Sequence, residues 1–189
     1  MDGRSCVIDG TLVAVRPAAR MEDTLQAFAI RAACFIGEQD RSFFEEFDGH
    51  DHDATHLIAT LGDEPIGTVR LRWFKSFATP DRLAVVQRYR GRAVGALLLE
   101  RARAVAESRG SRMLYVRATA LWAHYFERLG WRRLEETPGA NATMALVRPT
   151  DPAAVQPGFD AIETDELFTQ YAGDTIVTSP AGARLQVPR

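Results

Sequence analysis

The chain has 189 residues, of which 46% are hydrophobic and 25% are charged, a balance typical of one globular domain with its own core. The formal net charge of −2 and a pI of about 6.1 argue against a general nucleic-acid binder. Two cysteines, Cys6 and Cys34, lack the spacing of a disulfide framework or of a cysteine metal site. No apolar run approaches the roughly 18–20 residues of a membrane span, and a signal-peptide pattern is absent, so we expect a cytoplasmic protein that does not contact membranes.

The first elements follow a polar start. Residues 1–10 are expected to form a leader outside the domain, and residues 11–16 alternate as in a strand that ends before Pro17. A helix is expected next, because Glu22 and Asp23 suit a first helical turn and apolar residues follow at helical spacing. We expect its core face to comprise Leu25, Phe28, Ala29, Ala32, Ala33 and Ile36.

A loop and a hairpin are predicted next. Residues 37–53 are polar and acidic with several aromatics, which is typical of a loop with a short helical piece. Residues 55–61 and 65–73 are β-branched runs joined at Gly-Asp, a hairpin signal. Arg70 and Arg72 share one face of the second strand, and we expect a plain surface pair of little energetic weight, with contact to substrate, cofactor or the acidic loop as the alternatives.

The centre of the chain passes from strand through a tight turn into a helix. Residues 82–87 predict a buried strand, and residues 93–108 repeat apolar side chains at helical spacing up to Gly110. Backbone N–H groups at a helix start attract anions, and the arginines of the turn add charge-assisted bonds. The segment therefore predicts a pyrophosphate site, although an ordinary turn on an arginine-rich surface is the alternative. A Walker loop does not fit, because the single lysine is Lys75, and Gly-x-Gly-x-x-Gly is absent.

The last elements complete a mixed sheet. A strand is expected at residues 112–119, a helix at 121–129, and two strands at 131–135 and 142–147. Residues 149–189 form a C-terminal extension that begins like a linker and then packs or stays flexible. One β-α-β unit in this order holds the turn between the strand of residues 82–87 and the helix of residues 93–108, which we call the anion loop.

Residues 90–95 read Arg-Gly-Arg-Ala-Val-Gly, and this run resembles the (Gln/Arg)-x-x-Gly-x-(Gly/Ala) signature of the GNAT acyltransferase superfamily. The resemblance implies that the loop binds the pyrophosphate of acetyl-CoA, the expected cosubstrate. Ala93 replaces the usual first glycine, and we expect it to be tolerated there with a negative, helical φ. The cofactor-binding residues implied in this way are Leu83, Ala84, Val85, Arg90, Gly91, Arg92, Ala93, Val94, Gly95 and Ala96.

The resemblance also implies the fold. We expect an α/β (α+β) domain at residues 11–148, with a mixed, mostly antiparallel sheet of about seven strands and about four flanking helices. In the family the sheet splays in the middle, and the acyl-pantetheine arm lies in the gap. By position, the main chain of Leu83–Val85 orients the acyl group, with an N–H near Val85 polarising the thioester carbonyl. Exposed sheet edges make a homodimer the expected assembly.

The general acid is implied less directly. Family members often carry a tyrosine four residues before the glycine that ends this helix, and here that position is Phe126. Tyr125 lies one residue earlier, about 100° around the helix, and faces either the sheet or the thiol of the cofactor. We take Tyr125 as the candidate acid that protonates the leaving thiolate, with His124 or solvent as the alternatives.

The acceptor side is expected around residues 38–56. Its acids and three histidines suggest either a solvated loop facing a cationic amine or a general base, for which the candidates are His50, His52, His56, Glu38 and Glu46. A His50-x-His52 metal group is a third possibility, which we do not adopt. The run from residue 31 to residue 57 resembles a bacterial GNAT subgroup of undefined substrate. That resemblance implies Glu38 as a catalytic residue and the following contacts to the acceptor substrate: Gln39, Asp48 and His56.

The function expected from these residues is acetyl transfer from acetyl-CoA to a primary amine of a small molecule by direct attack. A GNAT-like sensor or assembly module that binds CoA without catalysis is the main alternative, favoured by Phe126 and Ala93. A transferase for longer acyl-CoA or an acyl carrier protein is a third. The sequence does not identify the acceptor amine.

Overall fold

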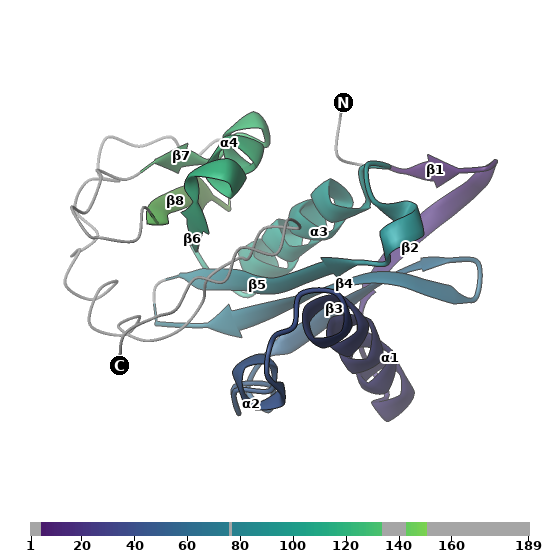
Figure 1. Cartoon of the computed structure of the whole chain (residues 1–189). Coiled ribbons are helices and arrows are strands. Elements are labelled where there is room, and N and C mark those ends of the chain that lie inside the picture. Colours follow the sequence, from purple (N-terminus) through teal and green to yellow (C-terminus); the bar gives the residue numbers. More distant parts are fainter. Residues whose placement is uncertain (1–4, 76, 134–142, 151–189) are drawn as a thin grey trace.

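The computed structural model describes residues 5–75, 77–133 and 143–150, which form one mixed sheet flanked by helices (Figure 1). The described strands are β1 (Val7–Ile8), β2 (Thr11–Pro17), β3 (Thr55–Leu61), β4 (Glu64–Trp73), β5 (Ala78–Val85), β6 (Met113–Thr119), β7 (Arg132–Arg133) and β8 (Thr143–Pro149). The described helices are α1 (Met21–Arg31), its π-helical continuation η1 (Ala32–Gly37), α2 (Phe43–Glu46), the 3-10 turn η2 (Gln87–Tyr89), α3 (Val94–Ser108) and α4 (Ala120–Arg128).

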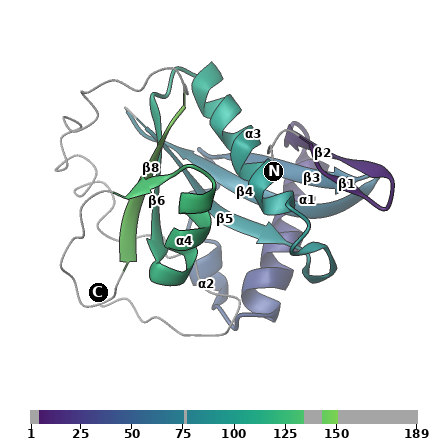
Figure 2. The same cartoon turned by 90° about the horizontal axis from the view of Figure 1, so that it is seen from above.

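The strands lie in the order β1-β2-β3-β4-β5-β6-β8-β7. Strand pairs are antiparallel except for β5 and β6, which are parallel and are connected through α3. Helix α3 covers one face of the sheet, and α1 and α2 cover the other (Figures 1 and 2). The mixed sheet, its mostly antiparallel pairing and the four α-helices confirm the predicted fold class.

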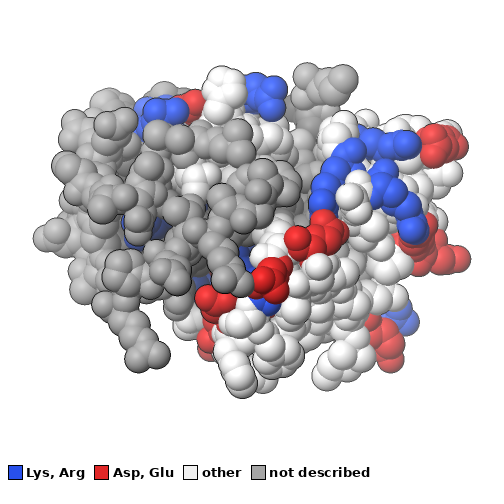
Figure 3. All heavy atoms as spheres, in the orientation of Figure 1, with Lys and Arg blue, Asp and Glu red and all other residues white. Residues whose placement is uncertain are grey.

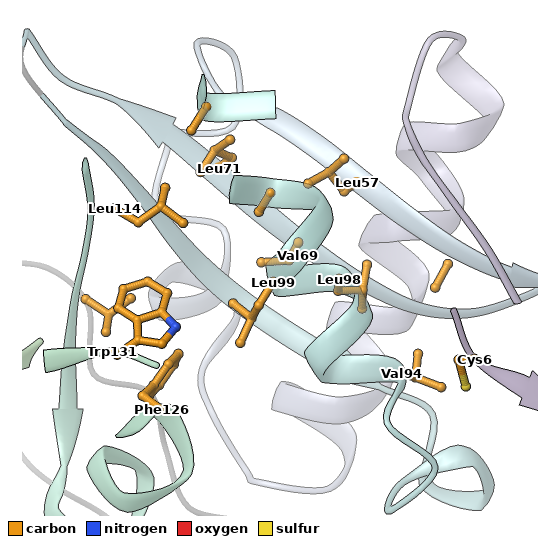
Figure 4. Packing of buried hydrophobic residues seen from close by; sticks show 14 of the residues in the cluster. Cys6, Leu57, Val69, Leu71, Val94, Leu98, Leu99, Leu114, Phe126 and Trp131 are labelled. Atoms are coloured by element: carbon orange, nitrogen blue, oxygen red, sulfur yellow. The ribbon is translucent and has the colours of Figure 1, made fainter. Parts of the chain in front are cut away.

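The main core lies between α3 and the sheet. Leu98 and Leu99 of α3 pack over β3 and β4, and Phe126 of α4 lies beside Trp131 (Figure 4). Gly67 allows α3 to approach β4 closely, because a Cβ at this position would lie 3.2 Å from each of three atoms: the Ala84 carbonyl oxygen, Leu98 Cδ1 and Val94 Cγ1. The strand and the helix on either side of the anion loop are therefore fixed to one rigid core.

The start of the chain corrects the prediction of a leader at residues 1–10. Val7–Ile8 forms β1 and pairs with β2, and the side chains of Cys6 and Ile8 are buried in the core. The Cys6 thiol donates a hydrogen bond of 2.9 Å to the Arg92 carbonyl oxygen, in the loop before α3. The sequence of this part is too short and too polar to reveal a two-residue strand.

Helix α1 buries a different face from the one predicted. Ala27, Ile30, Cys34 and Phe35 are buried, whereas Leu25 is 57% exposed. From Ala32 the helix widens into a π-turn, which shifts the register of all later side chains. The buried face also contains a charged residue, Arg31, and an apolar-periodicity argument passes over such a position.

Most other elements lie where the sequence predicts them. The β3–β4 hairpin, β6, α3 and α4 are confirmed to within one or two residues, whereas β5 begins four residues before the predicted strand. Strand β8 runs to Pro149, just beyond the predicted domain end, and Thr150 is buried against the start of β6. Residues 134–142 and 151–189, including most of the predicted C-terminal extension, lie outside the described residues. None of the helices in the described part is long and apolar enough to cross a membrane.

Candidate active site

The sheet opens between β5 and β6. In the described register these two strands share a single residue pair, Ala78 with Leu114, at the start of both strands. Beyond this pair the strands diverge (Figures 1 and 2), while β6 continues to pair with β8 along its whole length. From Thr79 to Val85 the main chain of β5 therefore forms no backbone hydrogen-bond ladder with β6. This leaves an open strand edge inside the sheet.

A bulge in β5 gives a physical reason for the divergence. Ala84 pairs with Thr68 and Asp81 pairs with Arg70, so two residues of β5 stand opposite one residue of β4. One of the two, Arg82, has a φ of +50°. A bulge of this kind bends the strand and increases its twist, which turns residues 83–85 away from β6.

The chain then turns sharply into α3. Val86 donates a hydrogen bond to the Ile66 carbonyl, η2 follows, and Gly91 adopts a φ of +78°. Ala93, the residue before α3, has a φ of +64° and lies in the left-handed region, so the predicted negative φ at Ala93 is wrong. An alanine side chain cannot cap the helix, and the first N–H groups of α3 receive no side-chain bond from Ala93.

Three arginines of this loop each bind an acid from a different element. Arg88 and the Tyr89 hydroxyl contact Glu64 of β4, and Arg92 lies 3.4 Å from the Asp9 carboxylate in the β1–β2 turn. Arg90 Nη2 lies 2.6 Å from Glu38 Oε2, at the end of η1. Basic and acidic side chains accordingly interleave on the right of the face shown in Figure 3.

Tyr125 points at the start of α3. A Cβ built on Gly95 would lie 3.1 Å from Tyr125 Oη and 3.7 Å from Leu83 Cδ2, so three elements converge there: β5, α3 and α4. Burial raises the pKa of the half-buried Tyr125 phenol, which keeps the hydroxyl protonated. Phe126 takes the core position instead, 2% exposed and 5.1 Å from the Trp131 ring. His124, the alternative acid, is largely exposed and lies 3.7 Å from Glu127.

Part of the acidic loop is held in ion pairs and not solvated, contrary to the expectation from its sequence, while Glu45 and Asp53 are exposed. Glu46, Asp48 and Asp51 bind two buried arginines, Arg31 and Arg70. Arg31 donates to Glu46 Oε1 at 2.6 Å and to Asp51 Oδ1 at 2.5 Å. Arg70 binds both Asp48 oxygens, at 2.7 and 2.8 Å. The prediction of a plain surface pair at Arg70 and Arg72 is therefore wrong, because Arg70 is fully buried, and Arg70 makes the alternative contact with the acidic loop.

Two further residues close this network. Arg70 also donates two bonds to Asp81 of β5, at 2.7 and 2.8 Å, and Arg82 donates to Asp48 Oδ2 at 2.8 Å. Burial by itself raises the pKa of the Asp48 carboxyl. The hydrogen bonds and charge of Arg70 outweigh this effect and hold the pKa well below its usual range. The network joins the loop before β3 to the bulge in β5, so it positions the open strand edge.

The predicted acceptor contacts are therefore divided between two places. Asp48 and His56 belong to the buried network: His56 is 6% exposed, its Nε2 lies 3.4 Å from the Asp51 carbonyl, and burial lowers its pKa. Glu38 and its neighbour Gln39 lie at the partly exposed end of η1, where Glu38 meets Arg90 of the anion loop. Within the described ranges, no three His, Cys, Asp or Glu side chains form a group that could hold a metal ion.

Sequence reasoning missed four residues that shape the site. Arg31, Asp81 and Arg82 are buried charges within otherwise apolar segments, and Cys34 lies against Arg90. A charged residue inside a predicted buried strand or helix face is a usable signal, because such a residue is buried only with a partner.

Comparison with known proteins finds similarity to one family. The model of the acetyltransferase (GNAT) domain matches residues 52–133, which include β5, the anion loop and α4. The chain is 27% identical over 118 residues to BSU40680 of Bacillus subtilis (strain 168), named as an acetyltransferase, across 61% of this chain and 80% of the relative. It is 25% identical over 119 residues to the N-acetyltransferase YjcF of the same organism, named as uncharacterized, across 62% and 85% of the two chains.

Solved structures share the fold. A crystal structure from Lactobacillus plantarum, named as an N-acetyltransferase, matches with a TM-score of 0.67 and 24% identity over 74% of this chain and 99% of that one. The PaiA N-acetyltransferase from Thermoplasma acidophilum, solved in complex with coenzyme A, matches with a TM-score of 0.56 and 13% identity over 72% and 98%. The family match over residues 52–133 and the sequence relatives, on a fold that these structures share, make this chain similar to the GNAT acetyltransferases and support an acyltransferase.

Proposed function

We propose that the protein transfers an acetyl group from acetyl-CoA to the primary amine of a small molecule. The observation that carries this proposal is the open edge of β5 beside the start of α3. An open strand edge can bind an extended, amide-containing arm, and a helix N-terminus can bind its pyrophosphate. Acetyl-CoA has both parts in one molecule.

The residues present fit the cosubstrate. The N–H groups of Val94, Gly95 and Ala96 start α3 and take no bond from the side chain at the N-cap, so they suit phosphate oxygens. Leu83–Val85 would hold the pantetheine arm and the acyl carbonyl through the main chain. Gly95 keeps the approach open, since a side chain there would meet Tyr125.

The chemistry follows from Tyr125 and Glu38. The amine nitrogen attacks the thioester carbon, the carbon–sulfur bond breaks, and the leaving thiolate takes the phenolic proton of Tyr125. Glu38 takes a proton from the acceptor ammonium before the attack, which leaves a neutral amine. As the amide forms, the nitrogen loses its second proton, which returns to the Tyr125 phenolate and restores the phenol. The phenol is protonated at neutral pH, as an ordinary tyrosine is, and burial raises its pKa further.

Calorimetric titration with acetyl-CoA, CoA and 3′-dephospho-CoA tests the cosubstrate. We expect micromolar dissociation constants, on the order of −8 kcal/mol. Gly95→Glu should weaken binding strongly through bulk and charge, whereas Ser108→Glu at the exposed end of the same helix should not. Absence of heat from all three ligands, in a protein shown to be folded, would refute the proposal.

Tyr125→Phe tests the acid. We expect kcat for acetyl transfer to fall by about 10²–10⁴-fold while CoA binding stays intact, because only a proton donor is lost. The matched variant His124→Ala should keep its activity. A large loss of kcat in His124→Ala, with none in Tyr125→Phe, would assign the role of the acid to His124.

A CoA-binding module without catalysis is the second candidate. The ion pair between Glu38 and Arg90 favours it, because the proposed base is occupied in this structure. Release of free thiol from acetyl-CoA with a panel of amines separates the two candidates. The homodimer and the cytoplasmic location stay predictions, and light scattering at several concentrations tests the first.

A further inference from the structure

Arg90 connects the two halves of the candidate site. Its Nε donates to the Val85 carbonyl at 2.8 Å, which ties it to the end of β5. Its Nη2 lies 2.6 Å from Glu38 Oε2 and 3.5 Å from Cys34 Sγ, both on η1. One guanidinium thus contacts the proposed acyl strand, belongs to the proposed pyrophosphate loop and neutralises the proposed base.

The end of η1 holds Glu38 in a defined place. The Glu38 N–H donates to the Ala33 carbonyl at 3.1 Å, and the buried Cys34 thiol lies 3.6 Å from the Val85 carbonyl. The side chains of Glu38 and Arg90 are 33% and 34% exposed, so an incoming anion can reach their ion pair. The backbone on both sides is anchored while the pair itself is accessible.

We propose that Glu38 and the cofactor pyrophosphate compete for Arg90, so that cofactor binding releases Glu38 to act as the base. This inference rests on the proposed function and adds an order to it: cofactor first, then acceptor amine. Without cofactor, Glu38 is held by Arg90 and does not serve the acceptor. With cofactor, Arg90 turns to the phosphates and the carboxylate becomes free.

Charge favours this exchange. A pyrophosphate carries more negative charge than a carboxylate and presents several oxygens to the planar guanidinium. The bound phosphates also repel a neighbouring carboxylate, which helps to separate Glu38 from the loop. Coupling between sites is reciprocal, so if the cofactor displaces Glu38, then Glu38 must weaken cofactor binding.

This reciprocity gives a distinctive expectation. Replacing Glu38, a proposed catalytic residue, should raise the affinity for the cofactor, because Arg90 then no longer has to break its ion pair with Glu38 to bind the phosphates. An exposed ion pair of this kind has a small free energy, so we expect Glu38→Gln to lower the dissociation constant of CoA about threefold. The same variant should lower the rate of acetyl transfer at saturating acetyl-CoA.

The chain offers a charge-matched control. Asp9 forms the equivalent pair with Arg92 on the same loop, but it lies in the β1–β2 turn, and its side chain is largely exposed. Asp9→Asn removes the same charge near the loop without touching Arg90. We expect it to change CoA affinity much less than Glu38→Gln does, because the Asp9–Arg92 pair is longer, at 3.4 Å against 2.6 Å, and the Asp9 side chain is 84% exposed.

The experiment is a calorimetric titration of CoA into the full chain and its variants: wild type, Glu38→Gln, Asp9→Asn, Arg90→Gln and the double variant Glu38→Gln/Arg90→Gln. Tighter binding in Glu38→Gln alone, lost when Arg90 is also replaced, supports the competition. Unchanged or weaker binding in Glu38→Gln, an equal gain in Asp9→Asn, or a gain that persists without Arg90 overturns it. Failure of the wild type to bind CoA refutes the proposed function instead.

Discussion

Two non-glycine residues with positive φ enclose the segment that forms the site. Arg82 lies in the bulge of β5 with a φ of +50°, and Ala93 precedes α3 with a φ of +64°. Each left-handed conformation costs roughly 1–2 kcal/mol in a residue with a Cβ. Contacts of each residue offset this conformational cost: Arg82 binds the acidic loop, and the Leu97 N–H donates to the Ala93 carbonyl at 3.0 Å. The strained backbone therefore lies at the two ends of the segment that holds the anion loop, and backbone strain is common at binding sites.

Ala93→Gly should therefore stabilise the protein. We expect the free energy of unfolding to rise by about 0.5–1 kcal/mol, since relief of the strain exceeds the added entropy of the unfolded chain. Gly91→Ala is the mirror control: its φ is +78° and a new Cβ would meet nothing within 4 Å, so only the backbone cost remains. That variant should lose about 1 kcal/mol in urea denaturation. Equal stability of all three proteins would contradict the strain at Ala93.

The residues of the site were predictable only in part. The anion loop is visible in the sequence because its motif is local, and Tyr125 could be named from its helix. The sign of φ at Ala93 was not accessible, since composition does not reveal a left-handed alanine. The pair between Glu38 and Arg90 joins residues far apart in the chain, and spacing alone does not predict it.

At the scale of elements, buried charge joins the loop before β3 to the sheet. Arg31 of α1 is fully buried between Glu46 and Asp51, and its guanidinium lies 5.1 Å from the centre of the Phe28 ring. Arg70 of β4 performs the same role against Asp48 and Asp81. The hairpin and α3 were predicted from local periodicity, whereas this loop was misjudged because its partners are non-local.

Arg31→Ala should be strongly destabilising. It removes the shortest ion pairs of Glu46 and Asp51. These carboxylates keep longer contacts with Arg82 and Arg70, both at 3.1 Å, and we expect a loss of about 3 kcal/mol in the free energy of unfolding. Arg133→Ala breaks a pair with Glu127 in which the arginine side chain is 39% exposed, and it should lose less than about 1 kcal/mol. Chemical denaturation of both variants checks the contrast. Similar losses for both would mean that the buried network does not hold the loop.

For the whole molecule, the charge network links stability to pH. His56 is buried and its pKa is lowered by burial from 6.5, so the unfolded chain binds a proton below pH 6.5 that the folded chain does not. Asp51 behaves in the same direction at lower pH: burial raises its pKa, but the bonds and charge of Arg31 outweigh this and lower it below 3.8. For these two groups the unfolded state binds more protons, so each makes stability fall as pH falls. Glu46 acts in the opposite direction, because burial raises its pKa above 4.5.

We expect the melting temperature to drop in two steps on acidification, the first below pH 6.5 and the second below pH 3.8. His56→Gln should remove the first step and retain the second. His124→Gln, at a largely exposed position, should leave both steps unchanged. Melting curves across this pH range test whether His56 causes the first step. If that step persists in His56→Gln, another group causes it.

The contact of the Cys6 thiol with the Arg92 carbonyl spans 86 residues of sequence. During synthesis the N-terminal residues leave the ribosome first, yet their docking site exists only after β5 and the anion loop have emerged. Closing so long a loop is entropically costly, so the Cys6 contact should form late, after the α3 core, although the β1–β2 pairing itself is local. A segment made early is thus expected to reach the anion loop among the last.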